Sequence, residues 1–231
     1  MTLHLLHLSD IHFAAGGIAV NGRDPAARLT TVLNAVSDRA VDALVLTGDL
    51  TDDGTHAAAA DLVAMLAPLG LPTLAVPGNH DDPQVIRDLF GPDVLELGPW
   101  RIIGMDSSRP GQIHGSVDVG TEMARIDRYD ERPTLLTLHH PPVSPSTHEW
   151  FQLDGAAELT AAVARRPHLR ALLTGHLHDP FEAGAVIGAP STLIAFQHDG
   201  DRIVIGGTGR TGARLCALHE DGTVASRFVQ A

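Results

Sequence analysis

Aspartate and histidine residues recur in this 231-residue chain directly after short apolar runs. The run 3–8 is followed by Asp10 and His12, and the run 44–46 is followed by Gly48 and Asp49. Three later runs end in the same way, at Gly78-Asn79-His80-Asp81, His139-His140 and Gly175-His176-Leu177-His178. Carboxylates and imidazoles are metal ligands and acid–base groups, so the pattern indicates a catalytic metal site.

The types of these side chains narrow the choice of metal. The groups supply three carboxylates, one amide and six imidazoles, without a thiolate. Such a set suits zinc, iron or manganese better than the all-oxygen sites of magnesium or calcium. One ion does not need so many ligands. Two ions that share a carboxylate, roughly 3.5–4 Å apart, account for the number, and the choice among the three metals stays open.

The separate fragments differ in how specifically they indicate a metal site. Asp-x-His occurs in solvated loops, and Gly-Asp after a strand is ordinary turn chemistry. Gly-Asn-His-Asp at 78–81 and Gly-His-Leu-His at 175–178 are more specific, and Gly78 would let the backbone turn sharply beneath the ligands. Because the fragments come in order and each follows an apolar run, we interpret them as one site.

The elements that must position these groups alternate between strands and helices in the first half of the chain. Strands are predicted at 3–8, 43–46 and 73–76. Helices are predicted from Pro25 to about Ala40, after Thr55 to about Pro68, and from Pro83 to Phe90, with Asp24, Thr55 and Asp82 as N-caps. This βαβαβ order predicts a parallel sheet, and the carboxyl ends of parallel strands share one rim. The polar groups can therefore converge.

The second half of the chain indicates a further sheet. A strand pair is predicted at 94–97 and 100–105, followed by a Gly/Pro loop at 107–115. Helices at about 117–129 and 156–165 lead to strands at 134–138 and 169–173, and a hairpin of 213–219 with 224–229 turns around Asp221 and Gly222. The chain shows no repeat or linker, so we predict one mixed α/β domain over 1–231 with two packed sheets.

Composition excludes several functional classes. The chain has 28 acidic and 16 basic residues, for a net charge of -12, and every basic residue is arginine. Without lysine, a Walker-type phosphate loop, a Schiff-base enzyme and a protein kinase are excluded. The longest basic run is Arg165-Arg166, which argues against specific binding to nucleic acid or to an anionic membrane.

Cysteine content and hydropathy indicate the compartment. Cys216 is the sole cysteine, which excludes a disulfide framework and favours a buried small residue in a strand. The first ten residues do not resemble a secretory signal, and no apolar run approaches the ~20 residues of a membrane span. We expect a cytoplasmic protein, and no feature indicates an oligomeric state.

The ordered motifs resemble those of the calcineurin-like metallophosphoesterases. The resemblance spans residues 3 to about 178, and the words Leu-Ser-Asp-Ile-His, Gly-Asp-Leu-Thr-Asp and Pro-Gly-Asn-His-Asp are most similar to the cyclic-nucleotide phosphodiesterase branch. It is carried by Asp10-x-His12, Gly48-Asp49, Gly78-Asn79-His80-Asp81, His139-His140-Pro141-Pro142 and Gly175-His176-x-His178. The resemblance implies a four-layer αββα sandwich, in which two mixed sheets are flanked by helices.

The resemblance also implies roles for individual residues. His80 would be the catalytic histidine, with Asp81 orienting it, and Asp49 would bridge the metals. One ion would be held by Asp10, His12, Asp49 and His178, and the other by Asp49, Asn79, His139 and His176.

Substrate contacts are less determined by the pattern. Asn79, His140 and His114 are candidates, although His140 is equally suited to ordering the Pro141-Pro142 turn and His114 to a solvated loop. Trp150 and Phe151 would stack on a base, cover the rim, or pack in the core.

The function implied is that of a binuclear metal-dependent phosphodiesterase that uses a metal-activated hydroxide on a small phosphoester, with 3′,5′-cyclic nucleotides such as cyclic AMP favoured. Alternative substrates are glycerophosphodiesters, nucleotide-sugar pyrophosphates and phosphoproteins, because metal ligands determine the reaction class and not the leaving group. A scaffold that keeps the fold without the chemistry is a further alternative, disfavoured by the intact ligands and His80. Residues 179–231 contain no recognisable lid or dimerisation extension, so we expect an open site.

Overall fold

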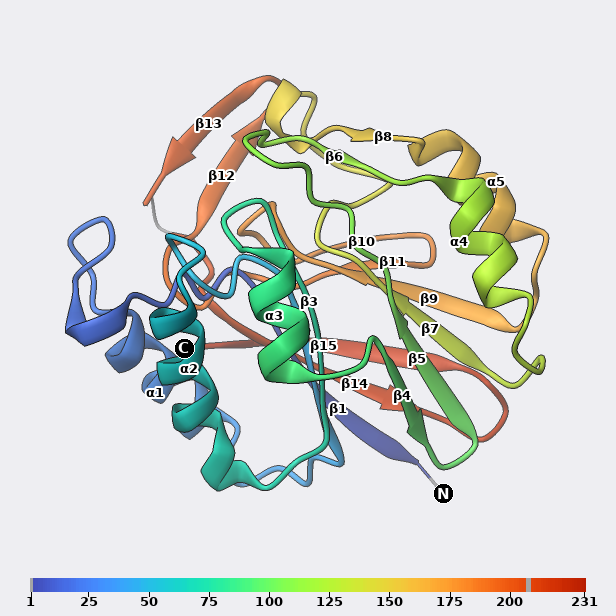
Figure 1. Cartoon of the computed structure of the whole chain (residues 1–231), viewed down its shortest axis with the longest axis horizontal. Helices are drawn as coiled ribbons and strands as arrows, with labels where there is room; N and C mark the ends of the chain where they lie inside the picture. The colour runs from blue at the N-terminus through green and yellow to red at the C-terminus, as the bar shows by residue number, and fades with distance from the viewer. Residues whose placement is uncertain (1, 207–208) are drawn as a thin grey trace.

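Two mixed β-sheets pack against each other in the computed structural model, which describes residues 2–206 and 209–231 (Figure 1). In the first sheet β1, β2 and β3 are parallel, β14 is antiparallel to β1, and β15 is antiparallel to β14. The spatial order of this sheet is β15 (Val224–Gln230), β14 (Gly212–Leu218), β1 (Leu3–Leu8), β2 (Ala43–Thr47) and β3 (Thr73–Val76).

The second sheet has a parallel centre and antiparallel edges. Its spatial order is β10 (Phe181–Ala183), β11 (Val186–Gly188), β9 (Leu169–Thr174), β7 (Thr134–Thr137), β5 (Trp100–Gly104) and β4 (Val94–Leu97). The central strands β5, β7, β9 and β11 are parallel, and β4 and β10 run antiparallel to their neighbours.

The outer face of the first sheet is covered by α1 (Pro25–Ala35), α2 (His56–Leu66) and α3 (Pro83–Phe90). Their predicted N-caps are confirmed: the side chains of Asp24, Thr55 and Asp82 each accept from backbone N–H groups of the first turn. Helix α1 ends well before the predicted residue 40. The Ser37 hydroxyl donates to the Asn34 carbonyl at 2.9 Å, and side-chain bonds of this kind compete with the helical ladder.

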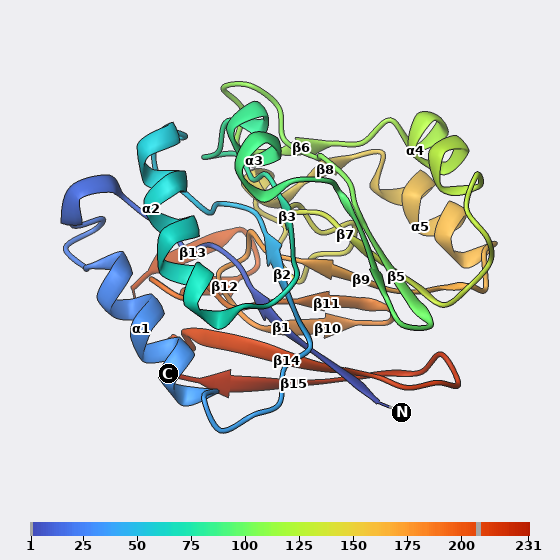
Figure 2. The same ribbon diagram turned by 60° about the horizontal axis from the view of Figure 1, so that its bottom comes forward.

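Helices α4 (Val119–Ile126) and α5 (Ala156–Ala164) cover the outer face of the second sheet. Helix α4 is shorter than the predicted 117–129. Its start is set by Asp118, whose side chain accepts from the Thr121 N–H at 3.0 Å as an N-cap. Figure 2 shows α1 and α2 on one side of the two sheets, and α4 and α5 on the other.

Three apolar layers hold this arrangement together. One lies between α1–α3 and the first sheet, another between the second sheet and α4–α5, and the third between the two sheets. Trp100 and Cys216 belong to the layer between the sheets, where burial raises the pKa of the Cys216 thiol to about 12. The predicted αββα sandwich is confirmed.

Shorter elements surround the carboxyl ends of the strands. They are β6 (Gly115–Ser116) with β8 (Leu153–Asp154), the hairpin of β12 (Phe196–Asp199) and β13 (Arg202–Ile205), and the short helices η1 (Ala15–Gly17), η2 (Ala67–Leu69) and η3 (Glu149–Phe151). The hairpin and η3 lie close together above the sheets in Figure 1. Among the described residues, no helix has the length and apolar character to cross a membrane.

Candidate active site

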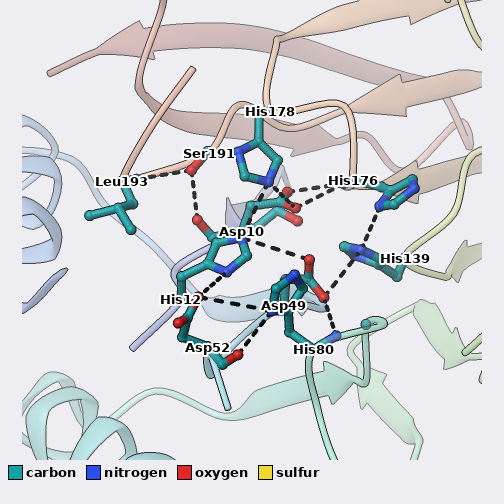
Figure 3. Close-up of polar contacts among 12 residues, drawn as sticks. Asp10, His12, Asp49, Asp52, His80, His139, His176, His178, Ser191 and Leu193 are labelled. Atoms are coloured by element: carbon teal, nitrogen blue, oxygen red, sulfur yellow. Dashed lines mark hydrogen bonds and ion pairs between the residues drawn. The ribbon is translucent and has the colours of Figure 1, made fainter. Parts of the chain in front are cut away.

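The loops that follow the parallel strands meet at one rim. The backbone N–H of His12 donates to the Asp49 carbonyl at 2.9 Å, which joins the loops after β1 and β2. The N–H of Gly175 donates to the His139 carbonyl at 3.0 Å and joins the loops after β9 and β7. The side chains from these loops point toward one another in Figure 3. The predicted convergence of the polar groups is therefore observed.

One cluster contains Asp10, His12, Asp49 and His178, all buried, with one possible ligand atom of each within 4.8 Å of the others. His178 Nε2 lies 3.2 Å from Asp10 Oδ1, and His12 Nε2 lies 3.7 Å from Asp49 Oδ2. This cluster corresponds to the first predicted ligand set.

A second cluster adjoins the first across Asp49. His139 Nε2 lies 3.4 Å from Asp49 Oδ1 and 3.1 Å from His176 Nδ1. Asn79 belongs to the same cavity, and its Oδ1 is buried with no hydrogen-bond partner in the described part of the chain. Because the Asp49 carboxylate directs one oxygen to each cluster, it has the position of a bridging group.

Hydrogen bonds to the far side of each ring determine the tautomers in the first cluster. His12 Nδ1 is 3.1 Å from Asp52 Oδ1, and His178 Nδ1 is 2.8 Å from the Ile194 carbonyl oxygen. Both oxygens are acceptors, so in the neutral rings each Nδ1 carries the hydrogen and each Nε2 has a lone pair. These two Nε2 atoms lie only 3.2 Å apart. Two facing lone pairs repel each other, and a cation bound by both nitrogens would remove this repulsion.

The second cluster repeats this arrangement. His139 Nδ1–H donates to the Thr47 carbonyl at 2.7 Å, and His176 Nε2–H donates to the Trp150 carbonyl at 2.8 Å. When both rings are neutral, the two nitrogens left with lone pairs are the pair that lies 3.1 Å apart. Lone pairs, carboxylates and an unpartnered amide oxygen together form a donor set that fits metal ions.

Ser191 connects the loop that carries Asp10 with the loop that orients His178, and both of these side chains belong to the first cluster. Its hydroxyl donates to the Asp10 carbonyl at 2.7 Å and accepts from the N–H groups of Leu193 and Ile194 (Figure 3). These bonds hold the loop whose Ile194 carbonyl orients His178. Ser191 is thus a support of the cluster that the sequence did not indicate.

The ligand-bearing loops have strained backbone. Left-handed conformation is uncommon for residues other than glycine, and its concentration at one place is typical of functional sites. Positive φ angles occur at Asp10 (50°), His12 (48°), Asp49 (47°), His176 (71°) and His178 (53°).

Gly78 and Gly175 are needed because other groups lie very close to their Cα atoms, and not because of an unusual φ angle. A Cβ on Gly78 would overlap the backbone nitrogen and Oδ1 of Asp49, and a Cβ on Gly175 would overlap the Ser9 hydroxyl. The φ of Gly78 lies outside the left-handed region, but the predicted turn is present, because the Asp81 N–H donates to the Gly78 carbonyl at 3.3 Å. Any larger side chain at 78 would displace the bridging carboxylate.

His80 borders the same cavity, with its ring centroid 4.7 Å from that of His12. Its Nδ1–H donates to the Asp52 carbonyl at 2.9 Å, which leaves Nε2 for a bound substrate. Asp81 does not have the predicted orienting role. Its carboxylate oxygens accept from the backbone N–H groups of Leu50, Thr51 and Gly78. The carboxylate is therefore directed at these backbone groups and not at the His80 imidazole.

The charged groups in the clusters shift one another's ionisation. Burial raises the pKa of Asp10, but His178 and His139 outweigh burial and bring it to about 2. Burial lowers the pKa of His139, but the Asp49 carboxylate outweighs it and brings the value to about 9. Burial also lowers the pKa of His80, but Asp49 and Asp52 together outweigh burial, so its pKa is raised. The two carboxylates stay ionised and favour positive charge beside them.

His140 lies beside His139 and His176 but has no free ring nitrogen for a substrate. Its Nε2–H donates to the Ile113 carbonyl at 2.9 Å, and its Nδ1 accepts from the Ser107 hydroxyl at 2.8 Å. The predicted substrate contact is therefore wrong. His140 instead holds the loop between β5 and β6.

His114 is also displaced from its predicted position at the substrate. It lines a neighbouring hollow together with Gln112 and Glu149, and its Nε2 accepts from Arg109 Nη1 at 3.2 Å. That arginine in turn pairs with Asp154 at 2.6 Å, so His114 belongs to a surface network outside the metal-cluster cavity.

The cavity at the clusters has a volume of about 220 Å³ and a mixed lining. Its polar lining residues are His12, Asn21, Asp49, Asp52, Asn79, His80, His176 and His178. Its apolar lining, here called the apolar wall, consists of Ile113, Trp150, Phe151, Ile194, Phe196 and Ile205. Phe151 is buried against His176 and His198, whereas Trp150 stays at the rim.

The comparisons with known proteins agree with this geometry. The family model for calcineurin-like phosphoesterases matches residues 3–180. The chain belongs to this family. The protein is therefore a metal-dependent phosphoric ester hydrolase, and its paired His/Asp clusters are like a binuclear metal site in composition.

Two relatives cover most of the chain. A 3′,5′-cyclic adenosine monophosphate phosphodiesterase from Pseudomonas aeruginosa is 33% identical, over 94% of this chain and 86% of its own. A cAMP/cGMP dual specificity phosphodiesterase from Mycobacterium tuberculosis is 34% identical, over 93% of this chain and 74% of its own. Among solved structures, a dimetal phosphatase from Danio rerio superposes with a TM-score of 0.61 at 16% identity, over 91% of this chain and 97% of that one, which supports the fold.

Proposed function

We propose that the protein is a binuclear metal-dependent phosphodiesterase that hydrolyses 3′,5′-cyclic nucleotides such as cyclic AMP. The observation that carries the proposal is the pair of facing imidazole nitrogens on each side of the buried Asp49 carboxylate. The similarity to cyclic-nucleotide phosphodiesterases over more than nine-tenths of the chain supports the choice of substrate.

Each cluster would hold one ion. Asp49 would contribute one oxygen to each, because its two oxygens face different clusters. The first ion would be held by Asp10, His12, Asp49 and His178, and the second by Asp49, Asn79, His139 and His176. The imidazole-rich set suits manganese, iron or zinc.

An acidic protein repels an anionic substrate, and bound metal ions would reverse this repulsion at the site. Two divalent ions bring four positive charges against the carboxylates of Asp10 and Asp49, so the cavity becomes cationic. When bound, they neutralise the phosphoryl oxygens and acidify a water for attack on phosphorus.

His80 would supply the proton to the leaving oxygen. The Asp52 carbonyl accepts from His80 Nδ1–H, which orients the ring and leaves Nε2 toward the cavity as the atom that exchanges the proton. Asp52 also accepts from His12 through its carboxylate. One residue thereby positions both a ligand and the acid.

A substrate panel tests the proposal. Metal-depleted protein, restored with Mn²⁺, Fe²⁺ or Zn²⁺ in turn, is assayed with cyclic AMP, cyclic GMP, bis(p-nitrophenyl) phosphate, a glycerophosphodiester and a phosphopeptide. We expect at least one ion to restore hydrolysis, with the highest kcat/KM for a cyclic nucleotide. A preference for the glycerophosphodiester or phosphopeptide would overturn the substrate assignment, and a protein that binds no metal would support the scaffold alternative.

A further inference from the structure

We propose that the apolar wall of the cavity binds the nucleobase of the substrate, with Ile205 of the β12–β13 hairpin as a specificity-determining residue. This inference rests on the proposed function and names the part of the site that would tell a cyclic nucleotide from another diester. The metal clusters can recognise only the phosphate, so recognition of the base requires other groups.

The first support is the exposure of large apolar side chains at the cavity. Ile205 is 55% exposed, Ile113 is 42% exposed and Trp150 is 36% exposed. They come from three separate segments of the chain and line the same cavity of about 220 Å³. Apolar side chains gathered at the mouth of a polar site are a common sign of ligand binding.

The second support is the contrast with the hollow on the other side of His80. That hollow, of about 480 Å³, also borders Asn79 and His80, but its lining includes Asp53, Asp82 and Arg109 and, among the described residues, no other aromatic or large aliphatic side chain. A flat base gains binding free energy when it stacks on aromatic and apolar surface, and it gains little binding free energy beside solvated carboxylates. Both hollows border Asn79 and His80, and the one with the apolar wall suits the base.

The third support is that the hairpin is anchored in place. The Thr147 N–H donates to the Gly200 carbonyl at 3.1 Å, and His198 Nε2–H donates to the Leu177 carbonyl at 2.7 Å. Phe196 stacks on His178, with ring centroids 4.0 Å apart and planes at 12°. The wall is thus joined directly to a ligand of the first cluster, and its surface is organised before a substrate arrives.

The hairpin offers a matched pair of residues for the test. Ile205 and its neighbour Val204 are similarly exposed, at 55% and 51%, but Ile205 lines the cavity and Val204 does not. Serine at either position removes apolar surface without adding charge, and neither side chain is needed in the core. Phe196 is unsuited to the test because its ring supports His178.

The experiment compares two substrates that differ only in the base. Cyclic AMP is assayed beside methyl ribofuranoside 3′,5′-cyclic phosphate, which has the same cyclic diester without the base. For metal-restored wild type we expect the KM for cyclic AMP to be lower by about tenfold or more. In Ile205→Ser this preference should fall several-fold through KM, whereas in Val204→Ser it should be unchanged.

The outcomes separate this inference from the proposed function. If wild type hydrolyses cyclic AMP but the Ile205→Ser variant keeps the full preference for the base, the inference is wrong and the proposed function stands. Equal KM values of wild type for both substrates would also overturn it. If wild type with restored metal hydrolyses neither cyclic phosphate, the proposed function fails and the inference fails with it.

Discussion

Asp49→Ala should lose both metal ions and lower kcat for cyclic AMP by on the order of 10³-fold or more. The Asp49 carboxylate directs one oxygen to His12 and the other to His139, and it is the group that the two clusters share. Without it, two like-charged ions would lie close together with no shared carboxylate between them, so both would be bound weakly. Metal content by elemental analysis, together with kcat, measures the effect.

Asp53→Ala is the matched control for this variant. Asp53 lies four residues further along the same loop, and its carboxylate bonds only with Thr55 among the described contacts. The control removes the same charge without touching the clusters, so both ions and wild-type kcat should remain. Two ions still bound per chain in the Asp49 variant would refute the bridging role.

His80→Ala should keep both ions but lose most activity toward substrates with a poor leaving group. His80 borders the cavity without belonging to either facing imidazole pair, and a positioned acid typically contributes 10²–10⁴-fold. We therefore expect kcat for cyclic AMP to fall within that range. Hydrolysis of bis(p-nitrophenyl) phosphate should fall much less, because nitrophenolate departs without a proton.

His56→Ala serves as the control for the His80 variant. His56 is exposed in the first turn of α2 and lies outside the residues that line the cavity. The same substitution there should leave metal content and both activities unchanged. An equal loss for both substrates in His80→Ala, or full activity toward cyclic AMP, would remove the proton-donor role.

The placement of the site was predictable because each polar group directly follows a strand. Alternating strands and helices, N-caps at Asp24, Thr55 and Asp82, and strand-terminal Asp and His residues are all local features. Parallel pairing then brings them to one rim. The extent of a single domain over 1–231 stays a prediction.

The supports of the clusters were not predictable in the same way. The rings of His139, His176 and His178 are oriented by backbone carbonyls of Thr47, Trp150 and Ile194, and a carbonyl has no residue-specific signature. These carbonyl groups also lie far from the histidines in the sequence or in another loop, so the spacing of residues in the sequence does not reveal them.

The wrong assignments have a related cause. Asp81 and His140 stand next to predicted site residues in the sequence, but each side chain bonds with backbone or hydroxyl groups of a different loop. Adjacency in the chain shows that a residue is near the site. It does not show which way the side chain points.

Stoichiometric restoration of metal-depleted protein tests the central claim most directly. Metal ions are added in known equivalents, and cyclic AMP hydrolysis is followed to saturation. The two clusters joined by Asp49 predict no activity without metal and a plateau at two ions per chain. Full cyclic AMP hydrolysis by the metal-free protein, or a plateau at one ion, would contradict a binuclear metal-dependent phosphodiesterase.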